Sequence, residues 1–212
     1  AYTSEENVML AMKYGANNYF KKPVLKNTFL SVLRKYANII QTQNYDKEIS
    51  SFQVKHNFNL QFNSSIEIIP SIVSYLVKET NGILSAAKQL DVRLGLSELL
   101  INAVEHGNME ISFFEKEKAI QDDKLNELYQ DKLNNQIFTK RIVDIKYSMN
   151  SGLCEWLISD QGAGFDYEHI PNPLGEDGLL RMHGRGIFIC RYQFDKMEYV
   201  GMGNQVRVSK RI

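Results

Sequence analysis

The chain has 212 residues, of which 43% are hydrophobic, and its 25 basic and 25 acidic side chains balance. This length suffices for one substantial hydrophobic core, or for one domain and a smaller piece. The even charge argues against an overall field that would draw the chain to nucleic acid or to a membrane surface. No apolar run is long enough to span a bilayer, and the first residues do not read as a secretory signal.

The two cysteines, Cys154 and Cys190, are too few for a disulfide scaffold or a zinc site. We expect both to act as small apolar side chains in a core. Together with the missing membrane span and signal, this cysteine usage predicts a cytoplasmic protein.

Residues 1–40 predict a helix, a short strand and a second helix. The stretch SEENVMLAMKYG begins at Ser4, a typical N-cap, and ends at Gly15, a typical residue after a helix. NNYFKKPV predicts a short extended run, and LKNTFLSVLRKYANII has apolar residues at helical spacing. A fragment of this size cannot bury a core alone, so we expect it to be the end of a larger domain.

In this order the segment resembles the last helix, strand and helix of a response-regulator receiver domain, with Lys22 and Pro23 at that family's Lys-Pro pair. The resemblance implies that Lys22 contacts a phosphoryl group in an intact receiver. The phosphoacceptor aspartate and its acidic metal pocket would lie upstream, so we expect this piece alone not to accept a phosphoryl group. The polar residues 41–51 predict a linker.

Residues 52–212 predict one α+β domain. VKHNFNLQF predicts a strand, and SIEIIPSIVSYLVKET a helix in which Pro70 lies in the first turn or causes a kink. DVRLGLSELLINAVEHG predicts a second helix, and residues 113–133 a charged, mostly exposed one. RIVDIKYSM with LCEWLISD, and KMEYVG with QVRVSKRI, predict two hairpins separated by the helix IFICRYQF. Helices followed by hairpins predict helices on one face of a mixed, mostly antiparallel sheet.

The stretch SELLINAVEHGN, residues 97–108, carries an unusual polar stripe. At helical spacing its apolar residues form one face, and four polar side chains lie within an arc of roughly 100° on the other: Glu98, Asn102, Glu105 and His106. Asn is a poor helix former, which argues against a plain solvated face. We expect Glu105 to be solvated and His106 to form a structural hydrogen bond, with a nucleotide contact as the alternative for His106.

Two glycine-containing loops follow. ISDQGAGFD places Asp160 at a strand end directly before Gly162 and Gly164, where a carboxylate can accept from an exocyclic amine and glycines allow close approach to a flat ring. HGRGIFIC places Gly184 and Gly186 at the start of a helix, whose free N–H groups suit phosphate. Each loop alone is a weak signal.

Taken together, these three segments over residues 52–212 resemble the GHKL ATPases, whose shared domain is the Bergerat fold. The resemblance implies ATP and Mg²⁺ as cofactors, with Asn102 coordinating Mg²⁺ and Glu98 acting as general base. It implies that Asp160 binds the adenine amine and that Gly162 and Gly164 shape its pocket. It also implies that Gly184 and Gly186 line the phosphates. Arg181 and Arg185 are further candidates for phosphate contact.

Within this family the helix and loops are most similar to the RsbW-type anti-sigma-factor serine kinases. This implies a protein serine/threonine kinase whose substrate is a small STAS-type antagonist, with a sigma factor as a second partner and a receiver domain as its regulator. Homodimerisation is a further expectation, because related kinases pair. The stretch between the glycine boxes would be a nucleotide lid. Asn204 and Gln205, before the last strand, differ from the small or hydroxyl residue that relatives often carry, which puts a further phosphate or adenine contact at that position in doubt.

Three alternatives stay open at this point. The domain could be a non-catalytic module that uses nucleotide only to set partner affinity. A histidine-kinase catalytic domain is disfavoured, because the only upstream histidine, His56, lies in a predicted strand. A gyrase-like or chaperone-like machine needs transducer domains for which this chain has no room. Residues 113–133 are extra to the minimal kinase and are expected to be a solvated insertion, with partner docking as the alternative.

Overall fold

The computed structural model describes residues 55–150, 152–167 and 185–212, and near the N-terminus Pro23, Val24, Lys26, 29–30 and 32–34. The chain divides into two units, Ala1–Ile49 and Ser50–Ile212, which are described separately. In the first unit Lys26, 29–30 and 32–34 are helical, within the second predicted helix. The other predicted elements of this unit, and Lys22, lie outside the described residues, so the receiver resemblance stays a prediction.

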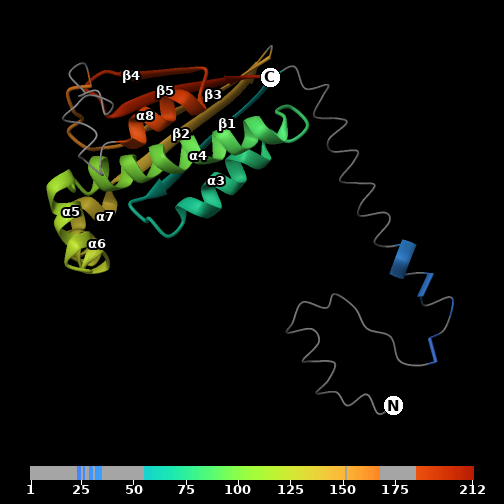
Figure 1. Ribbon diagram of the computed structural model, residues 1–212, viewed down its shortest axis with the longest axis horizontal. Coiled ribbons are helices and arrows are strands. Elements are labelled where there is room, and N and C mark those ends of the chain that lie inside the picture. The colour runs from blue at the N-terminus through green and yellow to red at the C-terminus, as the bar shows by residue number, and fades with distance from the viewer. Residues whose placement is uncertain are drawn as a thin grey trace. The chain divides into compact units, whose positions relative to one another are not determined.

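One layer of the second unit is a five-stranded sheet (Figure 1). The strands lie in the order β1 (Lys55–Asn63), β2 (Ile142–Asn150), β3 (Leu153–Ser159), β5 (Gln205–Arg211) and β4 (Lys196–Val200). All pairings between these strands are antiparallel, so the described sheet is wholly antiparallel and not mixed and mostly antiparallel, as predicted. Both predicted hairpins, β2–β3 and β4–β5, are confirmed, and tight turns of this kind join only antiparallel neighbours.

The strands have one buried face and one exposed face. In β2 the side chains of Val143, Ile145 and Tyr147 are buried, while Lys146 between them is exposed. This alternation follows from the strand geometry, in which successive side chains point to opposite sides of the sheet. The fully buried apolar side chains of β2 and β3 therefore gather on a single face of the sheet.

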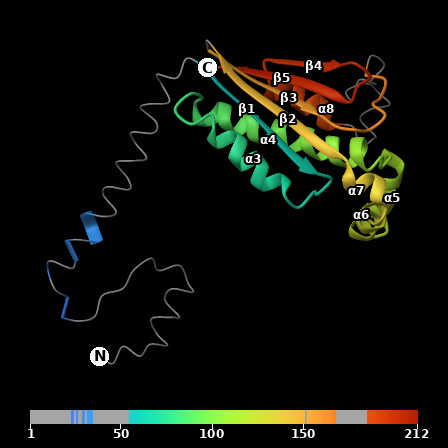
Figure 2. The ribbon, with the colours of Figure 1, turned by 180° about the vertical axis from the view of Figure 1, so that it is seen from behind.

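Three helices cover that face: α3 (Ile69–Lys78), α4 (Ala86–Asn102) and α8 (Arg185–Gln193) (Figures 1 and 2). Helix α4 packs against both α3 and α8. Pro70 lies in the first turn of α3, as predicted, where its missing N–H would have no helical partner. The two layers confirm the predicted α+β class with helices on one face of the sheet.

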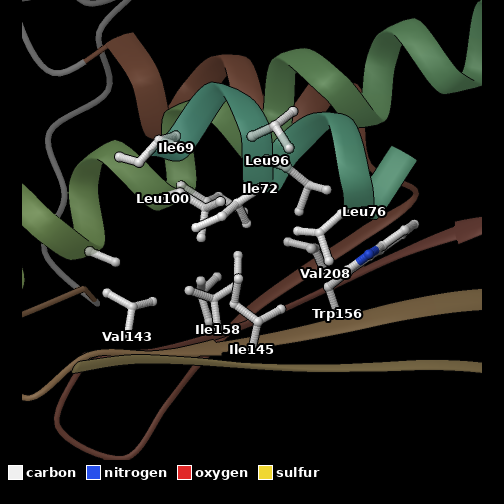
Figure 3. Close-up of a cluster of buried hydrophobic side chains, with 14 of the residues drawn as sticks. Ile69, Ile72, Leu76, Leu96, Leu100, Val143, Ile145, Trp156, Ile158 and Val208 are labelled. Atoms are coloured by element: carbon white, nitrogen blue, oxygen red, sulfur yellow. The ribbon is translucent and has the colours of Figure 1, made fainter. Parts of the chain in front are cut away.

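The hydrophobic core lies between these helices and the sheet (Figure 3). Leu76 of α3, Leu96 and Leu100 of α4, and Trp156 of β3 are fully buried in it. Burying one such side chain contributes about 1.5–3 kcal/mol to folding, so the core holds α4 firmly against the sheet. Cys154 and Cys190 are buried free thiols, as expected.

Helix α4 differs from the predicted helix 91–107 at both ends. It begins five residues earlier, at Ala86, because the Ser85 side chain caps it by accepting from the Lys88 N–H at 3.4 Å. Its last turn widens into a π-helical turn, η1 (Ala103–Asn108), in which the Met109 N–H donates to the Val104 carbonyl at 2.8 Å. Such π-turns are frequent at functional sites.

The charged stretch 113–133 is not one helix but two, α5 (Phe113–Gln121) and α6 (Leu125–Asn134), and a third short helix, α7 (Gln136–Lys140), follows it. Ser112 and Glu115 form a reciprocal capping box at the start of α5. Asp123 has a φ of 55°, a left-handed conformation that ends α5 and turns the chain into α6. These helices lie beside the C-terminal end of α4 (Figures 1 and 2).

Candidate functional site

A cavity of about 450 Å³ lies beside the C-terminal half of α4. Its walls are largely apolar and carry a few polar groups, the usual composition of a small-ligand site. The lining residues are Glu98, Leu99, Asn102, Ala103, His106 and Gly107 from α4 and η1; Phe113 and Lys116 from α5; Ile158, Asp160, Gly164 and Phe165 from β3 and the loop after it; Gly186, Ile187 and Ile189 from α8; and Tyr199, Gly203, Asn204, Gln205 and Val206 from the β4–β5 hairpin.

Six of the predicted site residues come together in this cavity, although the sequence separates them by up to 88 positions: Glu98, Asn102, His106, Asp160, Gly164 and Gly186. Gly162 does not line the cavity, but its N–H donates to Asp160 Oδ1 at 2.8 Å. Gly184 and Arg181 lie outside the described residues, as does most of the predicted lid. Arg185 is described only as the first backbone position of α8.

Asp160 is held at the end of β3 by close backbone packing. Its N–H donates to the Asn204 carbonyl at 3.0 Å, and the Asn204 amide donates to the Asp160 carbonyl at 3.2 Å. A Cβ on Gly107 would lie 2.4 Å from the Asp160 carboxyl group, and a Cβ on Gly162 would lie 2.4 Å from the Gly107 carbonyl oxygen. Glycine at both positions is therefore what allows the carboxylate to sit against the turn of η1.

The environment of Asp160 also changes its protonation. Burial raises the pKa of Asp160 to about 6, while the hydrogen bond from the Gly162 N–H and the charge of Arg141 oppose that rise. The carboxylate is therefore ionised at pH 7 but close to its titration. A partly buried acceptor of this kind can recognise an amine donor on a flat ligand.

The loop after Asp160 forms a further wall of the cavity. Gly164 has a φ of 77°, and a Cβ there would lie 2.0 Å from the Met202 carbonyl oxygen, so only glycine is accommodated. The neighbouring Phe165 ring packs edge-on against Tyr199, with 4.9 Å between ring centroids. Asn204 thus braces Asp160 and also lines the cavity together with Gln205, where the sequence had left a contact in doubt.

Glu98 and Asn102 lie one helical turn apart at the other end of the cavity. Within the part of the chain that the structure describes, neither side chain forms a hydrogen bond. A Cβ on Gly186 would lie 2.7 Å from Glu98 Oε2, so glycine at the start of α8 permits this helix to approach Glu98 closely. Backbone N–H groups in the first turn of a helix have no helical partner, which leaves them available to an anion.

The prediction that Glu105 is solvated is wrong. Its side chain is only 2% exposed, and its two carboxylate oxygens accept from Lys116 Nζ and from the Tyr129 hydroxyl, each at 2.5 Å. The sequence pattern placed Glu105 on the polar face of α4, but the inserted helices cover that position. The bonding partners of Glu105 therefore come from the stretch that was expected to be a solvated insertion.

The structural hydrogen bond predicted for His106 is confirmed: Nδ1 lies 2.6 Å from the Ile111 carbonyl oxygen. Burial lowers the pKa of His106, which keeps the ring neutral at pH 7. The neutral ring donates its Nδ1 proton to this carbonyl, because a carbonyl oxygen only accepts. His106 also lines the cavity, so its predicted nucleotide contact stays a prediction.

The lining residues that the sequence did not single out include Gly107, Phe113, Lys116 and Tyr199. A signal existed for Gly107, because a glycine near the end of a helix next to a polar stripe indicates close backbone approach. Phe113 and Lys116 gave no comparable signal, since they belong to a charged stretch with no motif. Only the docking of α5 beside α4 brings them to the cavity.

Comparison with known protein families identifies the domain that contains this cavity. Residues 69–210, about two thirds of the chain, match the model of the histidine kinase-like ATPase domain family. A comparison with curated proteins found no match. Among the described residues, no helix combines the length and apolar character needed to cross a membrane, and no three His, Cys, Asp or Glu side chains are grouped to hold a metal ion.

Proposed function

Because the chain belongs to the family of histidine kinase-like ATPase domains, we propose that it is an ATP-dependent serine/threonine protein kinase with its active site in the α4 cavity. Family membership implies nucleotide binding. The phosphoryl acceptor and the roles of individual residues belong to the proposal. In it, the adenine amine donates to Asp160, and the phosphate chain lies between Glu98, Asn102 and the start of α8.

The observation that carries the proposal is the pair Glu98 and Asn102. Both side chains line the cavity one helical turn apart, and neither is bonded to another described residue. Both side chains are half-buried at the cavity wall, where a ligand can reach their oxygens. Their availability supports a role toward a ligand.

The donor chemistry at this end suits Mg²⁺. The ion prefers hard oxygen ligands and keeps several waters and phosphate oxygens, so it needs only one or two protein ligands. The Asn102 amide oxygen, which lines the cavity, is such a ligand. When bound, the ion would neutralise charge on the phosphate chain.

Glu98 has the position of a general base. Its carboxylate would accept the proton of a serine or threonine hydroxyl while the hydroxyl oxygen bonds to the γ-phosphorus. The bond from that phosphorus to the β–γ bridging oxygen breaks, and ADP leaves. Asn102 and the start of α8 would hold the phosphate chain in line for this displacement.

The acceptor that we propose is a small STAS-type antagonist protein, with a sigma factor as a second binding partner. This follows from the similarity of SELLINAVEHGN and the loop order to the RsbW-type kinases. Control by a receiver domain in the intact protein, cytoplasmic location and homodimerisation belong to the same proposal. His56, by contrast, lies inside β1 and contacts Glu79 at 3.1 Å, which supports a structural role for it rather than that of a phosphoacceptor.

The test is phosphoryl transfer by the 212-residue chain. We would incubate it with γ-labelled ATP, Mg²⁺ and candidate STAS-type antagonists, and follow acid-stable label on serine or threonine. Label on the antagonist is the expected result. ATP binding without transfer would instead assign the chain to nucleotide-dependent partner binding, and label that is lost in acid but stable in base would indicate phosphohistidine and a histidine kinase.

A further inference from the structure

The inserted helix α5 contributes directly to the cavity. Phe113 and Lys116 lie one turn apart on α5 and both line the cavity. The Phe113 ring packs against the His106 ring at a centroid distance of 4.3 Å. The insertion is therefore part of the site and not a separate appendage.

Lys116 is held in place by a buried partner. Its ammonium group donates to Glu105 Oε2 at 2.5 Å, and the other oxygen of that carboxylate accepts from the Tyr129 hydroxyl of α6. The Glu105 side chain is 2% exposed and the Lys116 side chain 24% exposed, so the carboxylate is buried while the lysine reaches the cavity wall. A buried ion pair with a third hydrogen bond holds its members in one geometry.

The charges around the cavity make Lys116 distinctive. It is the one lysine or arginine among the lining residues that the structure describes, whereas Glu98 and Asp160 are acidic. His106 does not add positive charge, since its ring is neutral at pH 7. A polyanionic ligand in this cavity would otherwise meet two carboxylates without a resident cation in the described walls.

Lys116 also has bonding capacity to spare. An ammonium group has three N–H donors, and Glu105 takes one of them. No second acceptor for Lys116 occurs among the described residues. Two donors on a fixed cation at a cavity edge suit the oxygens of a phosphate group.

From these observations we infer that Lys116 of the inserted helix α5 binds the phosphate chain of the nucleotide. The inference rests on the proposed function, because it requires a nucleotide in the α4 cavity. It assigns the stretch 113–134 a role in the site: α6 supports Glu105, Glu105 holds Lys116, and Lys116 contacts the ligand. The insertion thus completes the nucleotide site.

The experiment compares Lys116→Met with the matched control Lys118→Met in the full chain. Lys118 lies on the same helix but is exposed and does not line the cavity. Binding of ATP, ADP and adenosine is measured by titration calorimetry. For Lys116→Met we expect affinity for ATP and ADP to fall about tenfold or more, the size of a lost charge-assisted hydrogen bond, while adenosine binds as it does to wild type. Lys118→Met should bind all three like wild type.

Two outcomes would overturn the inference: unchanged ATP affinity in Lys116→Met, or an equal loss for adenosine, which would mean that Lys116 only shapes the pocket. If Lys116→Met fails to fold, Lys116→Gln replaces it, because glutamine keeps a donor for Glu105 but removes the charge, and the same selective loss of ATP and ADP affinity is expected. Lys116→Arg should retain ATP binding. If wild type itself binds no nucleotide, the proposed function fails before this question arises.

Discussion

The two ends of the α4 cavity are built differently. At one end Asp160 is tied to its surroundings by hydrogen bonds with Gly162 and Asn204 and by backbone packed at contact distance. At the other end Glu98 and Asn102 have no hydrogen-bond partner among the described residues. The first end is shaped before a ligand arrives, which suits recognition of a rigid base. The second end keeps its polar groups available, which suits a charged, reacting phosphate chain.

The strongest test of this difference is Glu98→Gln. We expect phosphoryl transfer to fall by about 10²- to 10⁴-fold, because the general base is lost, while ATP affinity changes little. Initial rates with labelled ATP and separate binding titrations measure the two effects. Glu127→Gln, at an exposed position on α6 outside the cavity, is the matched control. Unchanged transfer in Glu98→Gln would remove Glu98 from the chemistry.

The next largest effect is expected at the base end. Asp160→Asn should weaken ATP, ADP and adenosine alike, by roughly 30- to 100-fold, because it replaces a charged acceptor in a partly buried site. Calorimetric titration of the three ligands checks this, with the exposed Asp131→Asn as control. A loss confined to ATP would show that Asp160 does not contact the base, and the contrast between the ends would fail.

Asn102→Ala should affect the opposite end only. We expect ATP affinity in the presence of Mg²⁺ to fall about tenfold, while adenosine binding stays the same, because the lost amide oxygen serves the phosphate end. Titrations of ATP and adenosine with and without Mg²⁺ show whether the loss depends on the ion. Asn126→Ala, at an exposed position on α6, is the control. If wild type and Asn102→Ala respond identically to Mg²⁺, Asn102 does not coordinate the ion.

The smallest expected effect is a pH dependence at the base end. Because burial raises the pKa of Asp160 to about 6, its carboxylate becomes protonated as the pH falls through that value. Adenosine, which carries no phosphate to titrate, should bind about fourfold more weakly at pH 5.5 than at pH 7. Binding to Asp160→Asn should lose this dependence, and a wild-type profile that is flat from pH 7 to 5 would contradict the assignment.

The same titration has the opposite sign for the stability of the ligand-free protein. A pKa that is higher in the folded than in the unfolded chain means that the folded state binds more protons between about pH 4 and 6. This contribution of Asp160 to stability is present below the unfolded pKa and is lost as the pH rises through about 6. Thermal melting of wild type and Asp160→Asn over this range should show the difference.

Much of the fold follows from local patterns. The alternation in β2 and β3, the hairpin turns and Pro70 at the start of α3 were all predictable, because strand pleat and proline geometry act over a few residues. Two features were missed although local signals existed. The Ser85 N-cap marks the start of α4 at Ala86, and the Ser112–Glu115 capping box marks the start of α5, so caps as well as periodicity are needed to place helix boundaries.

Some site residues were likewise predictable from the sequence, and others were not. The helical period of 3.6 residues was enough to place Glu98, Asn102 and His106 on one side of α4, and a strand end followed by glycines was enough to single out Asp160. That Glu105 is buried, that Gly107 touches Asp160 and that Lys116 reaches the cavity was decided by tertiary structure. Periodicity determines which way a side chain leaves its own helix, whereas what it meets there depends on segments that only the folded chain brings together.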